Sequence, residues 1–520
     1  MSARAVSVAE LLSGHADAGA AGAIVVHGLD LDSRTIRAGD AFVALAGTRS
    51  HGITFAPAAS ARGAAVVLAD PAGLAASAST AALPPATGNG ESGIVQDNGN
   101  GASGAVAVPV VWVEGMREAL GAIASRFYGE PSQALEVIGV TGTNGKTSTV
   151  QLLAQALQHA GHVAATIGTL GAGLYGAVRE GERTTPDAIA LHRLLAAFRD
   201  AGASHVAMEV SSHALDQGRV NAVAFDLAVF TNLTRDHLDY HGTMAAYGAA
   251  KERLFDWPGL AAAIINVDDA FGRVLAARMP RSVRRLRYGI ERDDAEIVAR
   301  AIEGHAGGLA FHLSTPWGEA DVRSRLLGRF NVSNLLAVAA CLGALGVPFD
   351  RLVAALDALE PVAGRMSRLG GSGAQPLVVV DYAHTPDALE QALTSLRAHC
   401  SGRLSVVFGC GGERDAGKRP EMGVVAESLA DRVVVTDDNP RGEDGDAIVE
   451  QILAGLRRPA HARVVRDRAA AIALAIGEAQ PGDVVLVAGK GHEPYQEIAG
   501  ERRPFDDLDV ARRALGARAC

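Results

Sequence analysis

The chain has 520 residues, 48% of them apolar but only 4% aromatic, and domains average about 150 residues, so this length predicts about three domains. A net charge of −10 argues against a general nucleic-acid-binding protein, and four cysteines are too few for a disulfide or zinc framework. No apolar stretch reaches the ~20 residues of a membrane span and the N-terminus lacks a signal-peptide pattern, so we expect a soluble, cytoplasmic protein without membrane insertion.

The N-terminal region contains three short apolar runs that predict strands, at 41–45, 64–69 and 108–113. Between the last two, residues 71–108 are dominated by Ala, Gly, Ser and Asn. Such a segment buries too little apolar surface to offset the entropy that it loses on ordering. We therefore expect a flexible surface insertion at about 71–108, within a first domain that ends near residue 113.

The middle region alternates apolar runs with helical patterns, which predicts a parallel, doubly wound sheet. The runs are 137–140, 205–210, 227–232 and 262–267. A glycine-rich turn, Gly142-Thr143-Asn144-Gly145-Lys146-Thr147, follows the first run directly. In such a turn, backbone N–H groups approach phosphate oxygens, the lysine reaches the β- and γ-phosphates, and the threonine binds Mg²⁺. Val140 replaces the first glycine of the standard spacing, so an incidental glycine-rich turn is the alternative.

Two more segments of the middle region contain possible metal ligands. Glu209 ends an apolar run, where nucleotide enzymes place a carboxylate on Mg²⁺, although a helix cap or a salt bridge is the alternative. His237 belongs to the segment TNLTRDHLDYH, and a neutral imidazole is a metal ligand. Lys251, in AAKERLF, has by itself the pattern of a solvated helix lysine.

In the C-terminal region apolar runs again alternate with helical patterns. The starts of most runs lie about 20–30 residues apart, which is the length of a βα unit. The runs are 377–381, 404–409, 432–437, 463–467 and 483–489. Polar residues follow these runs, at the edge where open α/β sheets bind ligands. They are His384, Glu413, Arg414, Asp438, Arg441, Lys490 and His492. Two sheets with such edges are expected to face each other across a cleft.

The ordered set of motifs resembles the Mur ligase family. GTNGKT, MEVSSHAL, TNLTRDHLDYHG, AAKERLF, GRFNVSN, DYAHTPD, GCGGERDAGKRP, DNPRGED and AGKGHE occur in the family's order within residues 31–507. The resemblance implies an α/β protein of three domains. These are a UDP-binding α/β domain (1–113), a central, mostly parallel sheet like that of P-loop ATPases (114–361), and a Rossmann-like amino-acid-binding domain (362–520).

The resemblance also implies an ATP site. The matching residues are Gly142, Thr143, Asn144, Gly145, Lys146, Thr147, Ser148, Asn331, Asn334, Arg365, Asp381 and His384. From the residues alone, Asn331 and Asn334 are more simply helix N-caps. Mg²⁺ is implied at Thr147, Glu209, His237 and Lys251, and the catalytic set is Lys146, Glu209, His237 and Lys251. In this family the lysine that corresponds to Lys251 is carbamylated by CO₂, and this reaction requires that the amine first become neutral.

Residues that match the contacts of a UDP-linked substrate lie in two domains. They are Leu31, Ser33, Thr48, Arg49 and Ser50 in the first domain, and Thr184, Thr185, Ser211, Gln217 and Arg219 in the second. By itself, LDSR at 31–34 indicates only a strand-to-turn transition. Arg183 stands where some family members have Asn, so its contact with substrate stays open.

A third set matches the family's diaminopimelate contacts: Arg414, Asp438, Asn439, Pro440, Arg441, Gly489 and Glu493. A proline turn with a solvated Arg441 is the alternative. The implied reaction joins meso-diaminopimelate to the D-glutamyl γ-carboxylate of UDP-N-acetylmuramoyl-L-alanyl-D-glutamate through an acyl phosphate, in peptidoglycan precursor synthesis. Arg441 is expected to hold the distal carboxylate bidentately, and Glu493 the distal ammonium. The alternatives are L-lysine as the added amino acid, or another amide ligase such as folylpolyglutamate synthase; small-molecule substrates and a monomer are expected.

Overall fold

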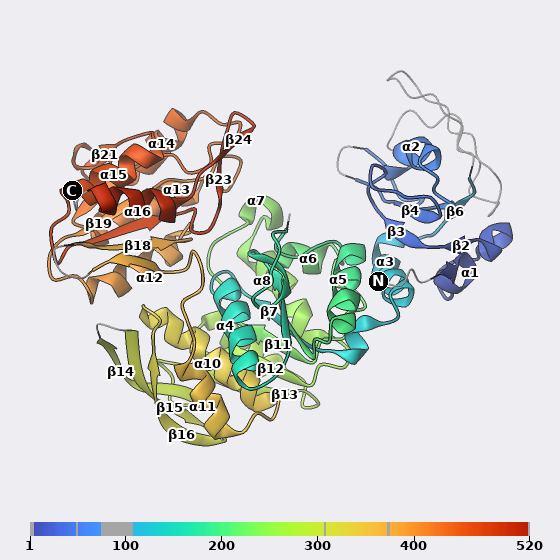
Figure 1. Ribbon diagram of the computed structural model, residues 1–520, viewed down its shortest axis with the longest axis horizontal. Coiled ribbons are helices and arrows are strands. Elements are labelled where there is room, and N and C mark those ends of the chain that lie inside the picture. The colour runs from blue at the N-terminus through green and yellow to red at the C-terminus, as the bar shows by residue number, and fades with distance from the viewer. Residues whose placement is uncertain are drawn as a thin grey trace.

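The computed structural model describes residues 5–47, 50–73, 108–181, 183–305, 308–371 and 375–517. Three α/β domains follow one another, and the N-terminal and C-terminal domains lie on opposite sides of the middle domain (Figure 1). This confirms the expected three-domain α/β class, while the limits 1–113, 114–361 and 362–520 stay a prediction. Residues 74–107 of the expected insertion lie outside the described residues. No helix in the described ranges is long and apolar enough to cross a bilayer.

The N-terminal domain contains a parallel sheet in the order β3-β4-β5-β6. Its strands are β3 (Gly28–Asp30), β4 (Asp40–Ala44), β5 (Val66–Ala69) and β6 (Val110–Trp112), beside the short pair β1 (Val6–Ser7) and β2 (Val25–Val26). The helices are α1 (Val8–Leu11), α2 (Ala56–Ala61) and α3 (Met116–Phe127). Alternate residues of β5 belong to two hydrophobic clusters, one with α3 and one with α2. Burial on both faces explains why this run is apolar throughout.

The middle domain contains a ten-stranded sheet in the order β16-β15-β14-β13-β12-β11-β7-β10-β8-β9. Its strands are β7 (Glu136–Thr141), β8 (Ala164–Gly168), β9 (Gly171–Leu174), β10 (His205–Glu209), β11 (Leu227–Phe230), β12 (Ala262–Asn266), β13 (Arg284–Gly289), β14 (Ile297–His305), β15 (Gly308–Thr315) and β16 (Gly318–Ser324). The pairings from β14 to β8 are parallel, and β9, β15 and β16 pair antiparallel at the edges. The mostly parallel sheet is therefore confirmed. The edge strands escaped prediction because none forms an apolar run: buried and partly buried residues alternate along β15, and β9 and β16 have few buried residues.

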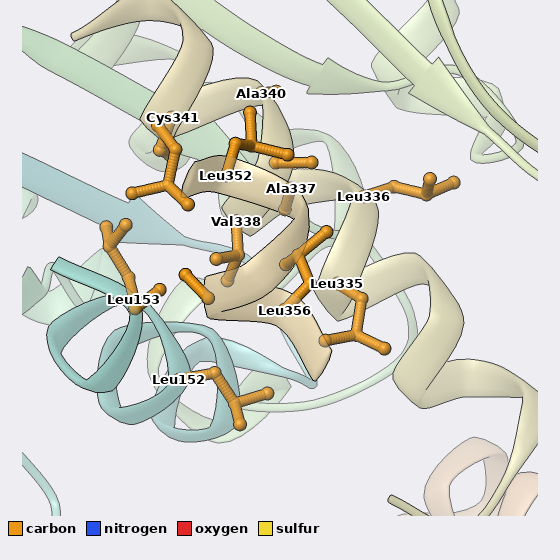
Figure 2. Close-up of a cluster of buried hydrophobic side chains, with 14 of the residues drawn as sticks. Leu152, Leu153, Leu335, Leu336, Ala337, Val338, Ala340, Cys341, Leu352 and Leu356 are labelled. Carbon is orange, nitrogen blue, oxygen red and sulfur yellow. The ribbon is translucent and has the colours of Figure 1, made fainter. Parts of the chain in front are cut away.

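The helices of the middle domain cover both faces of its sheet. They are α4 (Lys146–His159), α5 (Ala188–Asp200), α6 (Ser212–Asp216), α7 (Leu238–His241), α8 (Met244–Glu252), α9 (Ala270–Arg278), α10 (Arg329–Ala344) and α11 (Phe349–Asp357). Figure 2 shows how Leu152 and Leu153 of α4 pack with Leu335 and Val338 of α10 and with Leu352 of α11. Because α4 is buried in this way, the glycine-rich turn at its N-terminus is held against the sheet.

The C-terminal domain contains a six-stranded sheet in the order β17-β18-β22-β19-β20-β21, parallel except for β17. Its strands are β17 (Ser367–Gly370), β18 (Leu377–Asp381), β19 (Leu404–Phe408), β20 (Arg432–Val435), β21 (Arg463–Val464) and β22 (Val484–Ala488), with a separate hairpin of β23 (Tyr495–Ile498) and β24 (Glu501–Pro504). The helices are α12 (Pro386–Arg397), α13 (Lys418–Leu429), α14 (Gly445–Leu453), α15 (Arg468–Glu478) and α16 (Asp507–Ala517). Two clusters, one with α12 to α14 and one with α15 and α16, cover the two faces, which confirms the Rossmann-like class.

The junction between the first two domains is tightly packed. A Cβ atom on Gly121 of α3 would lie 2.2 Å from Asn221 O. Asn221 donates from Nδ2 to Glu118 O over 3.3 Å, and its own carbonyl accepts a hydrogen bond from His192 Nε2 over 3.1 Å. Burial lowers the pKa of His192 to about 4, although the hydrogen bond to Asn221 opposes this shift.

We expect His192 to make this fold acid-sensitive. Between pH 6.5 and about 4 the unfolded chain binds a proton at this residue that the folded chain does not, so stability falls as the pH falls. The loss amounts to roughly 2 kcal/mol between pH 7 and pH 5. His192→Gln should therefore lose less thermal stability than the wild type over this interval, whereas His461→Gln, on the surface, should not. Equal acid losses in melting temperature for His192→Gln and the wild type would contradict this.

Candidate active site

A cavity of about 530 Å³ lies between the middle and C-terminal domains. Its lining includes the glycine-rich turn at the start of α4, the segments that follow β10 and β11, the first turn of α10, and residues 381–391 of the C-terminal domain. Most of these segments follow the carboxyl end of a parallel strand, where open α/β sheets bind ligands. The predicted residues that line the cavity are Thr143, Asn144, Gly145, Lys146, Thr147, Ser148, Thr184, Glu209, Ser211, His237, Asn334, Arg365, Asp381 and His384.

The glycine-rich turn requires its two glycines. Gly142 and Gly145 have φ angles of +148° and +85°, and a Cβ atom on Gly142 would lie 1.9 Å from Thr231 Oγ1. Thr231 Oγ1 donates to Asn144 O over 2.6 Å, and Asn144 N donates to Asn232 Oδ1 over 2.8 Å. Val140, which replaces the missing glycine, lies inside β7 and is fully buried, so the turn begins only at Gly142. The segment after β11 thus holds the turn in place.

Lys146 and Lys251 donate to the same backbone carbonyl. Their Nζ atoms lie 2.9 Å and 2.8 Å from Gly142 O, and Lys146 also donates to Thr143 O over 2.8 Å. Lys251 is 1% exposed and its Nζ lies 4.3 Å from the centre of the Tyr247 ring, so the solvated-lysine alternative is wrong. Burial, and then the neighbouring Lys146 cation, lower the pKa of Lys251 well below its ordinary value. Burial also lowers the pKa of Lys146, against the carboxylates of Glu209 and Asp236.

Glu209 is a hydrogen-bond acceptor in the cavity wall. Its Oε1 accepts from Thr147 Oγ1 over 2.9 Å and from Thr169 N over 2.7 Å, while its Oε2 accepts from Thr169 Oγ1 over 3.2 Å. Arg365 donates to Thr147 Oγ1 over 3.1 Å. Glu209 forms no ion pair with a described residue and caps no helix, so neither alternative for this residue holds.

His237 lies beside a buried carboxylate. Burial lowers the pKa of His237 to about 3, against the attraction of Asp236, whose Oδ2 lies 3.4 Å from His237 Nε2. The imidazole is therefore neutral at physiological pH, and its ring centre lies 4.9 Å from that of His213. In the part of the chain that the structure describes, no three His, Cys, Asp or Glu side chains are grouped to hold a metal ion. A metal ion in the cavity would therefore need further ligands besides His, Cys, Asp and Glu side chains, such as the Thr147 hydroxyl and oxygens of a bound substrate.

Asp236 also connects the two domains that enclose the cavity. Its carboxylate lies 4.0 Å from His384 Nε2 and 4.0 Å from Lys418 Nζ, both in the C-terminal domain. Burial raises the pKa of Asp236, but His237, Lys418 and His384 together lower it to about 2. Arg235 forms ion pairs with Asp415 over 3.5 Å and Glu421 over 3.6 Å. The acidic Asp236 and the basic Arg235 of the middle domain thus each face side chains of opposite charge in the C-terminal domain.

The two asparagines of α10 lie inside the helix and do not cap it, so the capping alternative is wrong. Asn331 donates from Nδ2 to Leu327 O over 2.7 Å, and Asn334 donates from Nδ2 to Asn331 Oδ1 over 2.9 Å. Asn334 Oδ1 accepts from Thr149 Oγ1 over 3.3 Å and lies against Gly145. Asn334 lines the cavity, whereas Asn331 is buried behind it and orients it.

The C-terminal domain contributes aromatic and titratable groups to the cavity. Asp381 Oδ2 accepts from Met366 N over 2.7 Å, and burial raises the pKa of Asp381. Burial and then Lys418 lower the pKa of His384 to about 4. The Arg365 guanidinium lies 4.3 Å from the centre of the Tyr382 ring, a residue that the sequence did not single out.

The substrate residues predicted in the middle domain lie together beside Glu209. Thr185 donates from Oγ1 to Glu209 O over 2.8 Å, and Arg219 donates to Thr185 O over 3.1 Å and to Gln217 Oε1 over 2.9 Å. Burial, then Arg183, lowers the pKa of Arg219. Those predicted in the first domain are not brought to the cavity: Leu31 packs on the N-terminal core, Ser33 is buried, Ser50 is exposed, and Thr48 and Arg49 lie outside the described residues.

The residues predicted to bind the amino acid gather at the strand ends of the C-terminal sheet. Gly489, with φ +116°, lies so close to Asp438 that a Cβ atom would be 2.4 Å from Asp438 Oδ2. Burial raises the pKa of Asp438. Arg441 is half-buried and donates to Gly412 O over 2.8 Å. Asn439 and Pro440 are buried, Arg414 is exposed, and Glu493 pairs with Lys490 over 2.9 Å.

Models of three protein families match the chain. They are "Mur ligase family, catalytic domain" at 25–128, "Mur ligase middle domain" at 140–342, and "Mur ligase, glutamate ligase domain" at 364–491. Over 497 residues the chain is 54% identical to UDP-N-acetylmuramoyl-L-alanyl-D-glutamate–2,6-diaminopimelate ligase of Xylella fastidiosa (strain 9a5c), covering 95% of this chain and 94% of that protein. Over 514 residues it is 55% identical to the protein of that name in Xanthomonas campestris pv. campestris (strain 8004), covering 98% of each. The chain belongs to the Mur ligase family.

Solved structures agree with membership of the Mur ligase family. A structure of UDP-N-acetylmuramoyl-L-alanyl-D-glutamate–2,6-diaminopimelate ligase is 35% identical, with a TM-score of 0.67, and covers 99% of this chain and 100% of its own. Folylpolyglutamate synthase of Mycobacterium tuberculosis, complexed with ADP and AMPPCP, is 20% identical, with a TM-score of 0.59 over 71% of this chain and 91% of its own. This second likeness shows a shared fold alone.

In this Mur ligase, Thr169 is a residue that sequence reasoning missed. It follows β8, donates twice to Glu209, and its Oγ1 lies 3.1 Å from Thr184 Oγ1. It therefore links a predicted Mg²⁺ ligand to a predicted substrate contact. In the sequence, only its position directly after a short buried strand would have marked Thr169 as a site residue, and that strand, β8, was not predicted.

We expect Thr169→Val to slow ATP turnover roughly tenfold, because Glu209 Oε2 loses its hydroxyl donor while the backbone N–H stays. Thr169→Ser keeps the hydroxyl and should stay close to the wild type. Release of ADP, measured with all substrates present, tests both. If Val and Ser variants turn over equally fast, the hydroxyl does not orient Glu209.

Proposed function

We propose that the protein joins meso-diaminopimelate to the D-glutamyl γ-carboxylate of UDP-N-acetylmuramoyl-L-alanyl-D-glutamate, an ADP-forming step of cytoplasmic peptidoglycan precursor synthesis. The observation that supports this most is identity of 54–55% over nearly the whole chain with relatives that bear the name of this ligase. The gathering of Asn439, Arg441 and Glu493 at one edge of the C-terminal sheet also supports it.

Activation of the carboxylate is assigned to the cavity between the domains. A carboxylate reacts with an amine only after it acquires a better leaving group, so its oxygen attacks the γ-phosphorus of ATP and an acyl phosphate and ADP result. Phosphoryl transfer depends mainly on positioning and charge neutralisation. In the structure, Lys146 donates to two neutral backbone carbonyls. Negatively charged phosphate oxygens are stronger acceptors for its ammonium group. Asp381 and His384 meet ATP from the opposite domain.

The side chains around Glu209 suit Mg²⁺. Thr147 Oγ1 and Glu209 Oε1 lie 2.9 Å apart and are oxygen ligands of the kind that this ion prefers, and the neutral imidazole of His237 has a lone pair to offer. When bound, Mg²⁺ neutralises charge on the phosphoryl group in transfer. These residues would hold the ion, and Lys146 and Arg365 place positive charge near Glu209 and Thr147.

Lys251 is proposed to be carbamylated. Its amine and that of Lys146 share one acceptor, so two ammonium groups there repel each other. The lowered pKa favours the neutral amine, whose nitrogen attacks CO₂ and forms an N–C bond, and one proton leaves to water. The resulting anion removes the repulsion and supplies oxygens for Mg²⁺ near Gly142.

Amide formation completes the reaction. The α-amine of diaminopimelate attacks the acyl carbon, and the tetrahedral intermediate expels phosphate. The amine proton leaves to water or to a phosphate oxygen. The UDP group is assigned to Leu31, Ser33 and residues 48–50, and the muramoyl dipeptide to Thr184, Thr185, Ser211, Gln217 and Arg219. The protein is proposed to act as a monomer.

The two lysines at Gly142 are expected to be essential for different reasons. Lys146→Ala should abolish turnover because phosphate charge is left unneutralised. Lys251→Ala should be nearly inactive but partly rescued by added formate or acetate, which replace the carbamate anion. Rates of ligation with and without the added carboxylate measure this, with Lys146→Ala as the variant that the additive should not rescue. Full activity of Lys251→Ala without additive would rule out the carbamate.

The identity of the added amino acid is tested by offering meso-diaminopimelate and L-lysine in parallel with UDP-N-acetylmuramoyl-L-alanyl-D-glutamate and ATP. The wild type should prefer meso-diaminopimelate, because Arg441 binds the carboxylate that lysine lacks. Arg441 is half-buried, so its loss should reduce the preference roughly 10- to 100-fold, chiefly by weakening diaminopimelate. Arg457→Ala, on the surface of the same domain, is the control. Equal use of both amino acids by the wild type would refute the proposed function.

A further inference from the structure

Lysine is rare in this chain: only four of its 48 basic residues are lysines, and the others are arginines. Lys146 and Lys251 share the Gly142 carbonyl, and Lys418 lies 4.0 Å from Asp236 at the domain interface. The fourth, Lys490, follows β22 and its side chain is 0% exposed. A buried ammonium is costly without acceptors, so the partners of Lys490 indicate what it does.

Lys490 holds two of the predicted amino-acid contacts in one triangle of hydrogen bonds. Its Nζ lies 2.9 Å from Glu493 Oε2 and 3.1 Å from Asn439 Oδ1, and Asn439 Nδ2 donates to the same Glu493 Oε2 over 2.8 Å. No described residue donates to Oε1 of Glu493, whose side chain keeps 19% of its surface exposed. One carboxylate oxygen is therefore saturated, and the other is open.

The same contacts fix the loop that carries Arg441. Asn439 Oδ1 accepts from Lys490 and also from Glu497 N over 2.9 Å, so its amide has one orientation. Arg441 N donates to Glu497 O over 3.0 Å, and Ala499 N donates to Arg441 O over 2.7 Å. Lys490 thus ties the loop after β20 to the loop after β22, beside the hairpin edge that supports Arg441, whose φ is +54°.

We propose that Lys490 is the positioning residue of the amino-acid pocket: it donates to one oxygen of Glu493 and to the side-chain oxygen Oδ1 of Asn439, so that the second oxygen of Glu493 meets an ammonium group of the incoming amino acid. Lys490 itself does not touch the substrate. The inference rests on the proposed function, in which Glu493 receives that ammonium.

The electrostatics of Glu493 depend on this contact. Burial raises the pKa of Glu493, but Lys490 and the hydrogen bonds from Lys490 and Asn439 outweigh burial and lower it. The other charged or titratable groups near it are His492 on its own loop, Asp438 after β20, Arg468 of α15 and Tyr382 after β18. Without Lys490, the charge and the hydrogen bond that most strongly lower this pKa are lost while burial remains, so the pKa of Glu493 rises. A protonated carboxyl does not bind an ammonium group, so binding would then fail as the pH falls.

The test is Lys490→Met in the full-length enzyme, with KM measured separately for the three substrates between pH 5.5 and 9. We expect KM for meso-diaminopimelate to rise roughly 10- to 100-fold, while KM for ATP and for the UDP-linked substrate stays within about twofold of the wild type. The acid limb of kcat/KM for diaminopimelate should move to higher pH. In a Glu493→Gln background, Lys490→Met should add little, because the carboxylate that Lys490 positions is already replaced by a neutral amide.

Arg502→Met is the matched control, since Arg502 lies 4.5 Å from the Tyr495 ring that Lys490 also faces, but is exposed. Lys490→Gln provides the same measurements if Lys490→Met does not fold. Equal rises in all three KM values, an unchanged acid limb, or additive effects of Lys490 and Glu493 would each overturn the proposal. If the wild type itself adds no diaminopimelate in this assay, the proposed function fails, independently of Lys490.

Discussion

Parallel pairing of buried strands is the constraint on which both halves of the site depend. In each of the two larger sheets, the carboxyl ends of adjacent parallel strands lie at one edge, so residues far apart in the chain follow neighbouring strands. In the middle domain Thr147 meets Glu209 and Asn144 meets Thr231 in this way, and in the C-terminal domain Asn439 meets Glu493. The buried packing of α4 against α10 and α11 then keeps the glycine-rich turn at this edge.

Burial at these edges decides the state of the charged groups. A charge removed from water needs a partner, and where a partner is weak the group becomes neutral instead. Lys251 is buried beside the Lys146 cation and forms no ion pair with a described residue, so burial and then Lys146 depress the pKa of its amine, whereas Lys490 forms an ion pair with Glu493. His237 and His384 stay neutral although both lie near Asp236. The same fold thus places an amine of lowered pKa at one edge and a lysine paired with a carboxylate at the other.

Polar contacts join the middle and C-terminal domains beside the cavity, although Leu327 and Phe330 of the middle domain pack with the hydrophobic cluster of the C-terminal domain. Asp236 and Arg235 face Lys418, Asp415 and Glu421, and Asn144 donates to Asp387 Oδ2 over 2.9 Å. Polar interfaces between domains allow relative movement more readily than large apolar ones. The contacts that enclose the cavity are therefore of a kind that two domains can make and break around their substrates.

The sequence by itself determined the three-domain α/β class, the glycine-rich turn before α4 and the residues at the strand ends, because these depend on local properties: long apolar runs, glycines at positive φ, and motif order. It did not reveal β14 to β16, which lack a long buried apolar run, and the local patterns favoured a solvated Lys251 and capping roles for Asn331 and Asn334. Only the tertiary structure decided that Lys251 shares a carbonyl with Lys146, that Thr169 orients Glu209, and that Lys490 pairs with Glu493 and Asn439. Most of these contacts join segments distant in the chain, and burial, which sets the charge of each group, exists only once the domains are packed.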